Sequence, residues 1–470
     1  MLFTETRFFV FFAAYLLLHF LIPAAHRIWL IIVGGIVFYA WWRPDYLWVP
    51  VALTLIAFHG TSWLAAAADA RSRKWRLIAT LVVLFLPLAV VKYTYFVLAY
   101  ILGLVIDPAI LLNPPELVKW ALPLGISFIS FTACAYVIDV YRGRFPVEKR
   151  LRYLLAHILF FPHLIAGPIL RPHELIPRLK AMRPARDARF MLGLSIFTLG
   201  LVKKVVFADQ ISSAVESAYG AAAATAGALD YITAFYGFAV QIYCDFSGYT
   251  DMAIGLALII GMRLPNNFLR PYGAASITEF WRRWHITLSH WLRDYLYIPL
   301  GGNRNGVFAQ TRNMLITMTL GGLWHGANWT FVIWGLLHGL TLAMNHQLAR
   351  FLGRGRALLP NWLAVIITFH WVAVLWVLFR APDMDTAFRV LGGPFTASWE
   401  NLAVDLGRGA FPLPLTAVFF LFHRYDRHAY LRIANRRVNP ALQYAVIFVC
   451  WIVAIAVSQG SSAKFIYFDF

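Results

Sequence analysis

Long apolar runs recur along almost the whole chain, from Phe8 to Ser458. A helix that crosses a bilayer needs roughly 20 mostly apolar residues, and many of these runs approach that length. The 470 residues are 60% hydrophobic and 13% charged, whereas a soluble domain carries about 25% charged residues. The alternating pattern of barrel strands is absent. The sequence therefore predicts an all-α polytopic membrane protein, and we expect residues 1–470 to form one integral-membrane domain.

The formal net charge of +19 comes from arginines and lysines that gather in short loops between the apolar runs. Cytoplasmic loops are enriched in these residues, so this placement indicates membrane topology and no nucleic-acid partner. The clusters expected on the cytoplasmic side are Arg71–Arg76, Arg142–Arg152, Arg171–Arg189, Arg263–Arg312, Arg350–Arg356 and Arg424–Arg437. The segments expected outside are Ile106–Glu116, Asp209–Asp230 and Asp383–Leu406.

Connecting the two sides gives about ten spanning helices and places both termini outside. The predicted spans are 8–24, 28–42, 47–69, 77–98, 119–141, 190–208, 231–260, 361–380, 412–423 and 441–458. Segments 153–170 and 314–346 begin and end near basic loops, so each is expected to be a hairpin or a re-entrant element. Re-entrant backbone is tolerated only where protein or water surrounds it, which predicts a cavity around 314–346.

Span 231–260 carries an unusual polar stretch, Gln241–Asp251, which includes Asp245 and Ser247. Ionisable residues inside an apolar run are costly and mark functional candidates. The stretch predicts either a break in the helix or a polar pocket, and we include Asp245 and Ser247 among the candidate binding residues.

His325 lies inside the apolar segment 314–346, flanked by Gly321, Gly322 and Gly326. A histidine can act as a general base near neutral pH without an extreme pKa shift. The glycines allow close approach, and their amides are candidates for binding an oxyanion. The alternative is a histidine that is hydrogen-bonded to a neighbouring helix. Trp324 and Asn328 are candidate binding residues beside it.

His285 follows two arginines and a tryptophan in the stretch Ile277–Tyr297, where apolar residues recur at helical spacing. Aromatic and basic residues together also suit an interfacial helix whose histidine reaches the headgroups. Arginine binds phosphate through a bidentate fork, so Arg282 and Arg283 are candidates for holding a phosphate-bearing donor. Weaker candidates are Arg293, Arg304, Lys203 and Lys204. No metal-ligand spacing accompanies the histidines, and no metal is expected.

Several ordered motifs resemble the membrane-bound O-acyltransferase (MBOAT) family, above all its bacterial branch of alginate O-acetylases and teichoic acid D-alanyl transfer proteins. The motifs are Pro123–Phe128, Tyr136–Gly143, Phe161–Pro168, Asp245–Ala253, Phe280–Ser289, Trp291–Arg304 and Gly321–Gly326. The resemblance implies a ring of tilted helices around a central tunnel. The family's invariant histidine falls on His325 and its second motif histidine on His285.

The resemblance also implies a function: transfer of an acetyl group from cytoplasmic acetyl-CoA toward an exported polysaccharide, with alginate as the first expectation. It implies a bacterial inner membrane, a periplasmic acetyltransferase or acceptor protein as partner, and no tightly bound cofactor. Other glycans, including cellulose, peptidoglycan and teichoic acid, remain open as acceptors. A proton-coupled transporter and a scaffolding membrane protein are the alternative classes.

Overall fold

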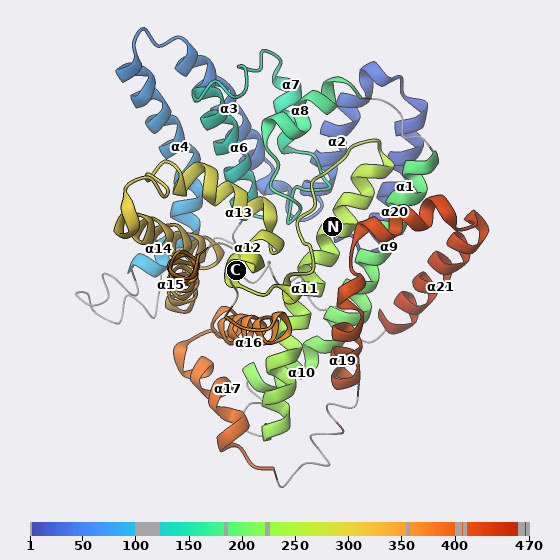
Figure 1. Ribbon diagram of the computed structural model, residues 1–470. Helices are drawn as coiled ribbons and strands as arrows, with labels where there is room; N and C mark the ends of the chain where they lie inside the picture. Colours follow the sequence, from blue (N-terminus) through green and yellow to red (C-terminus); the bar gives the residue numbers. More distant parts are fainter. Residues whose placement is uncertain are drawn as a thin grey trace. The chain divides into compact units, whose positions relative to one another are not determined.

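The computed structural model describes residues 2–98, 123–182, 187–220, 226–353, 358–399, 407, 411–458 and 466. Throughout these residues the regular secondary structure is helical (Figure 1). The all-α prediction is confirmed. The predicted outer segment Ile106–Glu116 and the first residues of span 119–141 lie outside the described residues.

The chain forms two compact units, and the first comprises Met1–Gly193 and Ala253–Pro265. In this unit α3 packs against α4 and α6, and α7 packs against α2 and α8. Its helices are α1 (Thr6–Leu21), α2 (Arg27–Ala40), α3 (Trp48–Ala65), α4 (Ala70–Phe96), α6 (Ile126–Tyr141), α7 (Leu151–Ile158) and α8 (Pro172–Lys180), with the 3-10 turns η1 (Ala24–His26) and η2 (Pro44–Tyr46). The prediction of a single domain for 1–470 stays a prediction.

The second unit comprises Leu194–Met252 and Asn266–Phe470, and it contains both motif histidines. The helices α9 (Asp187–Val202) and α11 (Ala228–Ile259) belong mostly to it. The other elements are η5 (Lys203–Ala208), α10 (Asp209–Tyr219), η7 (Pro271–Gly273), α12 (Ile277–Arg283), α13 (Ile286–Leu292), η8 (Arg293–Tyr297), α14 (Gly306–His325), α15 (Trp329–Leu352), α16 (Asn361–Arg380), α17 (Met384–Thr396), α19 (Pro412–Phe422), η9 (His423–Tyr425), α20 (His428–Arg437) and α21 (Pro440–Ser458).

Five helical stretches of the described chain are long and apolar enough to cross a membrane. They are Pro44–Ala65, Ala70–Thr94, Arg189–Tyr219, Asn361–Arg380 and Pro440–Ser458. Three further apolar helices, Thr6–Leu21, Ala24–Ala40 and Ile126–Tyr141, are shorter. These helices overlap predicted spans, and the protein is a multi-pass membrane protein. The helix Arg189–Tyr219 runs past the predicted span 190–208 into the segment Asp209–Asp230 that was predicted to lie outside. The number of ten spans stays a prediction, since α19 has only 11 residues.

Segment 314–346 forms a helical hairpin, in agreement with one of the two forms expected for it. In Figure 1, α14 and α15 lie side by side, and only three residues separate them. Segment 153–170 begins as the short helix α7 and continues from 159 to 170 as irregular, buried chain. Protein surrounds this irregular backbone, which is the condition under which a membrane protein tolerates it.

The structure decides one alternative that the sequence left open and corrects one prediction. The polar stretch Gln241–Asp251 does not break its helix, because α11 runs unbroken for 32 residues. Its carboxylates are instead paired with cations, so the polar-pocket alternative holds. The stretch Ile277–Tyr297 is not one helix: the chain leaves helical geometry at Trp284 and His285, between α12 and α13.

Candidate active site

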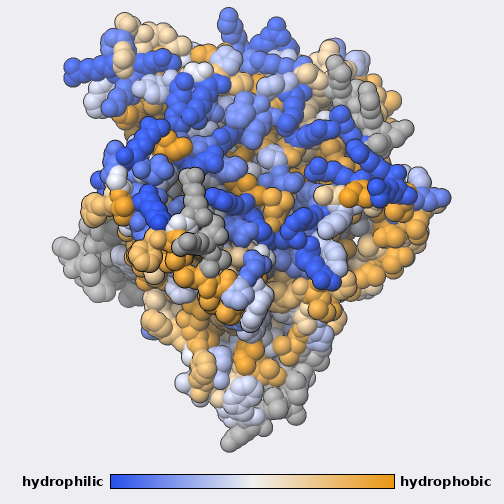
Figure 2. All heavy atoms as spheres, viewed as in Figure 1, coloured by the Kyte–Doolittle hydropathy of each residue, from blue (hydrophilic) through white to orange (hydrophobic). Residues whose placement is uncertain are grey.

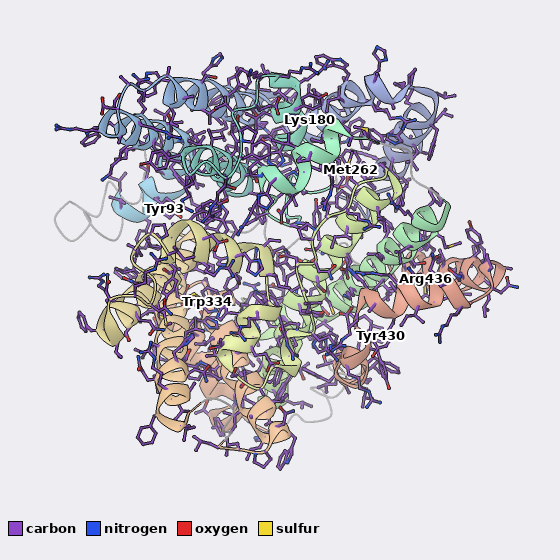
Figure 3. The ribbon with its side chains drawn as sticks, turned by 45° about the horizontal axis from the view of Figure 1, so that its top comes forward. Tyr93, Lys180, Met262, Trp334, Tyr430 and Arg436 are labelled. Atoms are coloured by element: carbon purple, nitrogen blue, oxygen red, sulfur yellow. The ribbon has the colours of Figure 1, made fainter. Side chains whose placement is uncertain are left out.

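His325 is the last residue of α14, and its side chain is buried, with 4% exposure. Three aromatic rings surround the imidazole. The ring centroids of Trp324, Trp334 and Phe379 lie 4.9, 5.3 and 5.1 Å from that of His325. These residues come from α14, α15 and α16, and Trp334 is labelled in Figure 3. The three helices therefore form an apolar box that fixes the orientation of the imidazole.

Glycines bring the two helices of the hairpin together. A Cβ atom added at Gly322 would overlap the carbonyl oxygen of Phe331, and one added at Gly335 would overlap that of Met318. Gly321 and Gly322 lie inside α14, where backbone amides bond within the helix, and the Gly326 amide donates to the Gly322 carbonyl at 3.3 Å. The glycines thus serve helix packing, and their amides have partners other than an oxyanion.

Replacing Gly335 with alanine is expected to destabilise the hairpin by about 1–3 kcal/mol, the usual effect of overpacking. The added methyl group meets backbone of α14, which can relieve the overlap only by moving. Because His325 ends α14, any activity that depends on this histidine should fall as well. Gly392→Ala is the matched control, since a Cβ there meets nothing within 4 Å. Equal melting temperatures and activities of the two variants would contradict this account.

His285 is fully buried at the start of α13, with a φ of 40°. Few non-glycine residues adopt a positive φ, and such strained residues cluster at functional sites. The Asn267 Oδ1 atom accepts bonds from Thr287 N at 3.1 Å and Thr287 Oγ1 at 2.9 Å, and lies 3.3 Å from His285 Nδ1. We assign the proton to Nδ1, because an oxygen that already accepts two bonds faces it. Asn267 thus sets the tautomer of His285.

Trp324 brings the two histidines into one aromatic cluster. Its ring centroid lies 6.3 Å from that of His285 and 4.9 Å from that of His325. On its other side His285 contacts Phe246 of α11 at 4.7 Å. His285 lies between two helices of seven residues each, which are too short to span a membrane. Burial lowers the pKa of His285 to about 3, so the imidazole is neutral. A neutral imidazole of such low basicity is better suited to orienting a substrate than to accepting its proton.

A cavity of about 750 Å³ lies between α12, α13 and η8 on one side and the α14–α15 hairpin on the other. Its lining includes Trp281, Leu292, Arg293, Gln310, Met318, His346 and Arg350. This volume is within the roughly 300–1,000 Å³ of ligand pockets. The cavity expected around 314–346 is therefore present, although His325 itself does not line it.

The cavity wall and the box around His325 share neighbouring side chains. Leu292 lines the cavity and lies 3.1 Å from where a Cβ of Gly321 would stand, one turn before His325. Trp281 also lines the cavity, and its ring lies 5.9 Å from Trp334, which contacts His325. A ligand in the cavity is thus connected to the imidazole through two packed rings, Trp281 of the cavity wall and Trp334 beside His325.

The arginines favoured by the sequence lie elsewhere. Arg283 pairs with Glu279 and donates to the carbonyl oxygens of Arg270 at 3.3 Å and Gly273 at 3.1 Å. Arg282 is exposed on α12 and interacts electrostatically with His346 of the cavity wall. The cavity-lining cations are instead Arg293, a weaker candidate of the sequence analysis, and Arg350, which that analysis missed. Arg350 stood at the edge of a basic cluster, where sequence gives no sign of which cations face inward.

The remaining candidates hold the fold together. Asn328 caps α15 by accepting the Thr330 amide at 3.2 Å, and its Nδ2 donates to the Pro382 carbonyl at 2.6 Å. Asp245 binds Lys204 at 2.7 Å and accepts the Ile466 amide at 2.7 Å. Ser247 is buried near it on α11. None of these three lines the cavity of 750 Å³.

Lys203 and Lys204, weaker candidates for phosphate binding, are buried in carboxylate cages. Lys203 lies 2.7 Å from both Asp251 and Asp426. Lys204 lies 2.7 Å from both Asp209 and Asp245. The signal was visible in the sequence as lysines and aspartates in neighbouring apolar runs, but pairing them required the tertiary structure.

Comparison with known proteins identifies the family. The model of MBOAT, the membrane-bound O-acyltransferase family, matches residues 150–380. A probable alginate O-acetylase of Azotobacter vinelandii is 41% identical over 83% of this chain and 76% of its own length. The peptidoglycan O-acetyltransferase of Helicobacter pylori is 36% identical over 79% of this chain and 74% of its own. The teichoic acid D-alanyltransferase of Bacillus subtilis is 28% identical over 54% and 68%. With its helical fold and its buried motif histidines, this chain belongs to the membrane-bound O-acyltransferase family and is an O-acyltransferase.

Proposed function

We propose that this enzyme transfers an acetyl group from acetyl-CoA to a hydroxyl group for the O-acetylation of an exported polysaccharide, alginate in the first instance. The supporting observation is a ligand-sized cavity with two arginines, whose wall residue Trp281 packs on Trp334, a ring of the box around His325. The names of its relatives, an alginate O-acetylase and a peptidoglycan O-acetyltransferase, support acetyl transfer to a glycan. Peptidoglycan is the second candidate acceptor, because that relative is nearly as similar.

In the proposed reaction, His325 accepts the proton of the acceptor hydroxyl as its oxygen attacks the thioester carbonyl. The tetrahedral intermediate collapses, the carbon–sulfur bond breaks, and the proton passes to the leaving thiolate of CoA. A positioned base of this kind contributes about 10²–10⁴-fold. His285, held by Asn267, orients the donor or acceptor. Trp324, whose ring lies between the two histidines, would form the wall against which the acyl group lies.

The protein is proposed to lie in a bacterial inner membrane with both termini in the periplasm. The donor is proposed to enter from the cytoplasmic side. This follows the distribution of basic loops. The acceptor is proposed to be a periplasmic protein of the same pathway or the polysaccharide itself. In the transporter alternative the histidines relay protons, and buried carboxylates would favour it. The buried Asp209, Asp245, Asp251 and Asp426 are all paired with lysines. We therefore do not pursue it.

Incubating the purified protein with acetyl-CoA labelled in the acetyl group tests the proposal. We expect release of CoA and transfer of label to an added oligosaccharide, with alginate oligomers preferred over peptidoglycan fragments. A purified, folded enzyme that leaves acetyl-CoA intact while using another acyl donor would overturn the choice of donor. Label on peptidoglycan fragments alone would overturn the choice of acceptor.

Replacing Arg350 with glutamine is expected to raise the KM for acetyl-CoA by about tenfold, because a hydrogen bond to a charged group is worth about 1.5–3 kcal/mol. The value of kcat should change little, since the phosphates are remote from the reacting carbonyl. Arg282→Gln is the matched comparison, as Arg282 is exposed and does not line the cavity. A larger KM effect at Arg282 would restore the assignment made from the sequence.

A further inference from the structure

The segment that links α19 to α21 is fixed to the helical bundle by buried charges. Asp426 accepts a bond from Tyr243 Oη at 2.6 Å and lies 2.7 Å from Lys203. His428 contacts Asp251 through Nε2 at 2.8 Å and Asn266 through Nδ1 at 3.1 Å. These contacts fix Asp426 and His428, and so they fix the start of the basic helix α20.

Beside this anchor lies a second hollow, of about 250 Å³. Its walls come from α9, η5, α11, α19 and the start of α20, and they are mainly apolar. The lining includes Leu199, Val202, Phe207, Phe419, Phe422 and Leu431. The volume is below the roughly 300–1,000 Å³ of sites that enclose a whole small molecule. It therefore suits part of a long apolar chain.

The side of the hollow formed by the α19–α20 connection is positively charged. Arg427 contributes to the lining, and the segment Arg424–Arg437 contains five arginines. The one acidic residue of this segment, Asp426, forms an ion pair with Lys203. Within the described part of the chain, no carboxylate pairs with Arg427 or with the arginines of α20. Figure 2 shows hydrophilic side chains along α20 beside hydrophobic ones over α21, and Figure 3 shows α20 between the labelled Tyr430 and Arg436.

We propose that this hollow and Arg427 bind one anionic phospholipid, with part of an acyl chain against the phenylalanines and the phosphate on the guanidinium. A helix with basic residues on one face and apolar residues on the other lies at the membrane interface. Arginine clusters on such helices attract anionic lipids by about 1 kcal/mol per residue. The helix α20 has this character and follows an apolar helix on each side. The site is distinct from the acyltransfer cavity, and the proposal does not depend on the acyl donor.

Native mass spectrometry of the purified protein tests this site with phosphatidylglycerol and phosphatidylcholine of the same chains. We expect one phosphatidylglycerol to be retained about fivefold better than phosphatidylcholine. Arg427→Gln should remove this preference, whereas Arg436→Gln, a control in helix α20 outside the hollow, should retain it. Leu431→Trp should fill the hollow and reduce retention of both lipids.

Three results would overturn the proposal. One is equal retention of the two lipids by the wild-type protein, which needs no variant to fold. Another is an equal effect of Arg427→Gln and Arg436→Gln, which would indicate diffuse attraction to basic charge. The third is displacement of phosphatidylglycerol by millimolar inorganic phosphate, which would indicate an anion site without an acyl chain.

Discussion

Replacing His325 with alanine is expected to lower acetyl transfer by about 10²–10⁴-fold, the contribution of a positioned general base. The imidazole is the one strongly polar side chain in a box of three aromatic rings. Removing it leaves no other proton acceptor in that box. The loss should appear in kcat, because the base acts in the transition state and the cavity proposed for the donor is formed by other residues.

Two further variants separate lost chemistry from lost packing. His325→Gln keeps much of the side-chain volume but supplies no base, so it should be as inactive as the alanine variant. His19→Gln is the matched control, because His19 is also fully buried on an apolar helix and stacks on Tyr15 at 6.0 Å. It should retain activity. Wild-type acetyl transfer by folded His325→Gln protein would sink the proposed mechanism.

The sequence predicted the helices well, because the length and the flanking charges of a membrane span can be recognised within the segment itself. Each apolar run needs only its own length to be recognised, and the structure places helices such as α16 within a residue of the predicted span. Breaks were harder to predict. The positive φ of His285 depends on Asn267 and Thr287, which hold the turn through side-chain bonds that no periodicity reveals.

The candidate site was predicted less completely. Both motif histidines stood out as polar residues in apolar surroundings, and the structure places them in one aromatic cluster through Trp324. The cation assignments differed, because sequence gives the side of the membrane on which an arginine lies but not whether it faces a cavity. Arg283 is held by Glu279 and two carbonyl oxygens, whereas Arg350 lines the cavity. Asn328, a candidate binding residue in the sequence, caps α15 by accepting the Thr330 amide.

Replacing Lys203 with methionine is expected to destabilise the protein by about 3–5 kcal/mol, the usual effect of removing one partner of a buried ion pair. The side chain of Lys203 is 9% exposed and lies between Asp251 and Asp426, which are 7% and 13% exposed. Its loss leaves Asp251 with His428 and leaves Asp426 with the bond from Tyr243 but without a cation beside it. Unfolding by SDS in mixed micelles measures the change in free energy.

The double variant Lys203→Met/Asp426→Asn decides whether charge is the cause. It removes one positive and one negative charge and leaves the pair of Asp251 and His428, whose atoms lie 2.8 Å apart. The asparagine oxygen can still accept the bond from Tyr243. Most of the lost stability should therefore return, since a buried ion pair replaced as a whole is often neutral. Arg43→Gln, which breaks a pair that is 47% and 53% exposed, should cost about 0–1 kcal/mol. If the double variant were as unstable as Lys203→Met, the lysine would act through packing of its stem rather than through its charge.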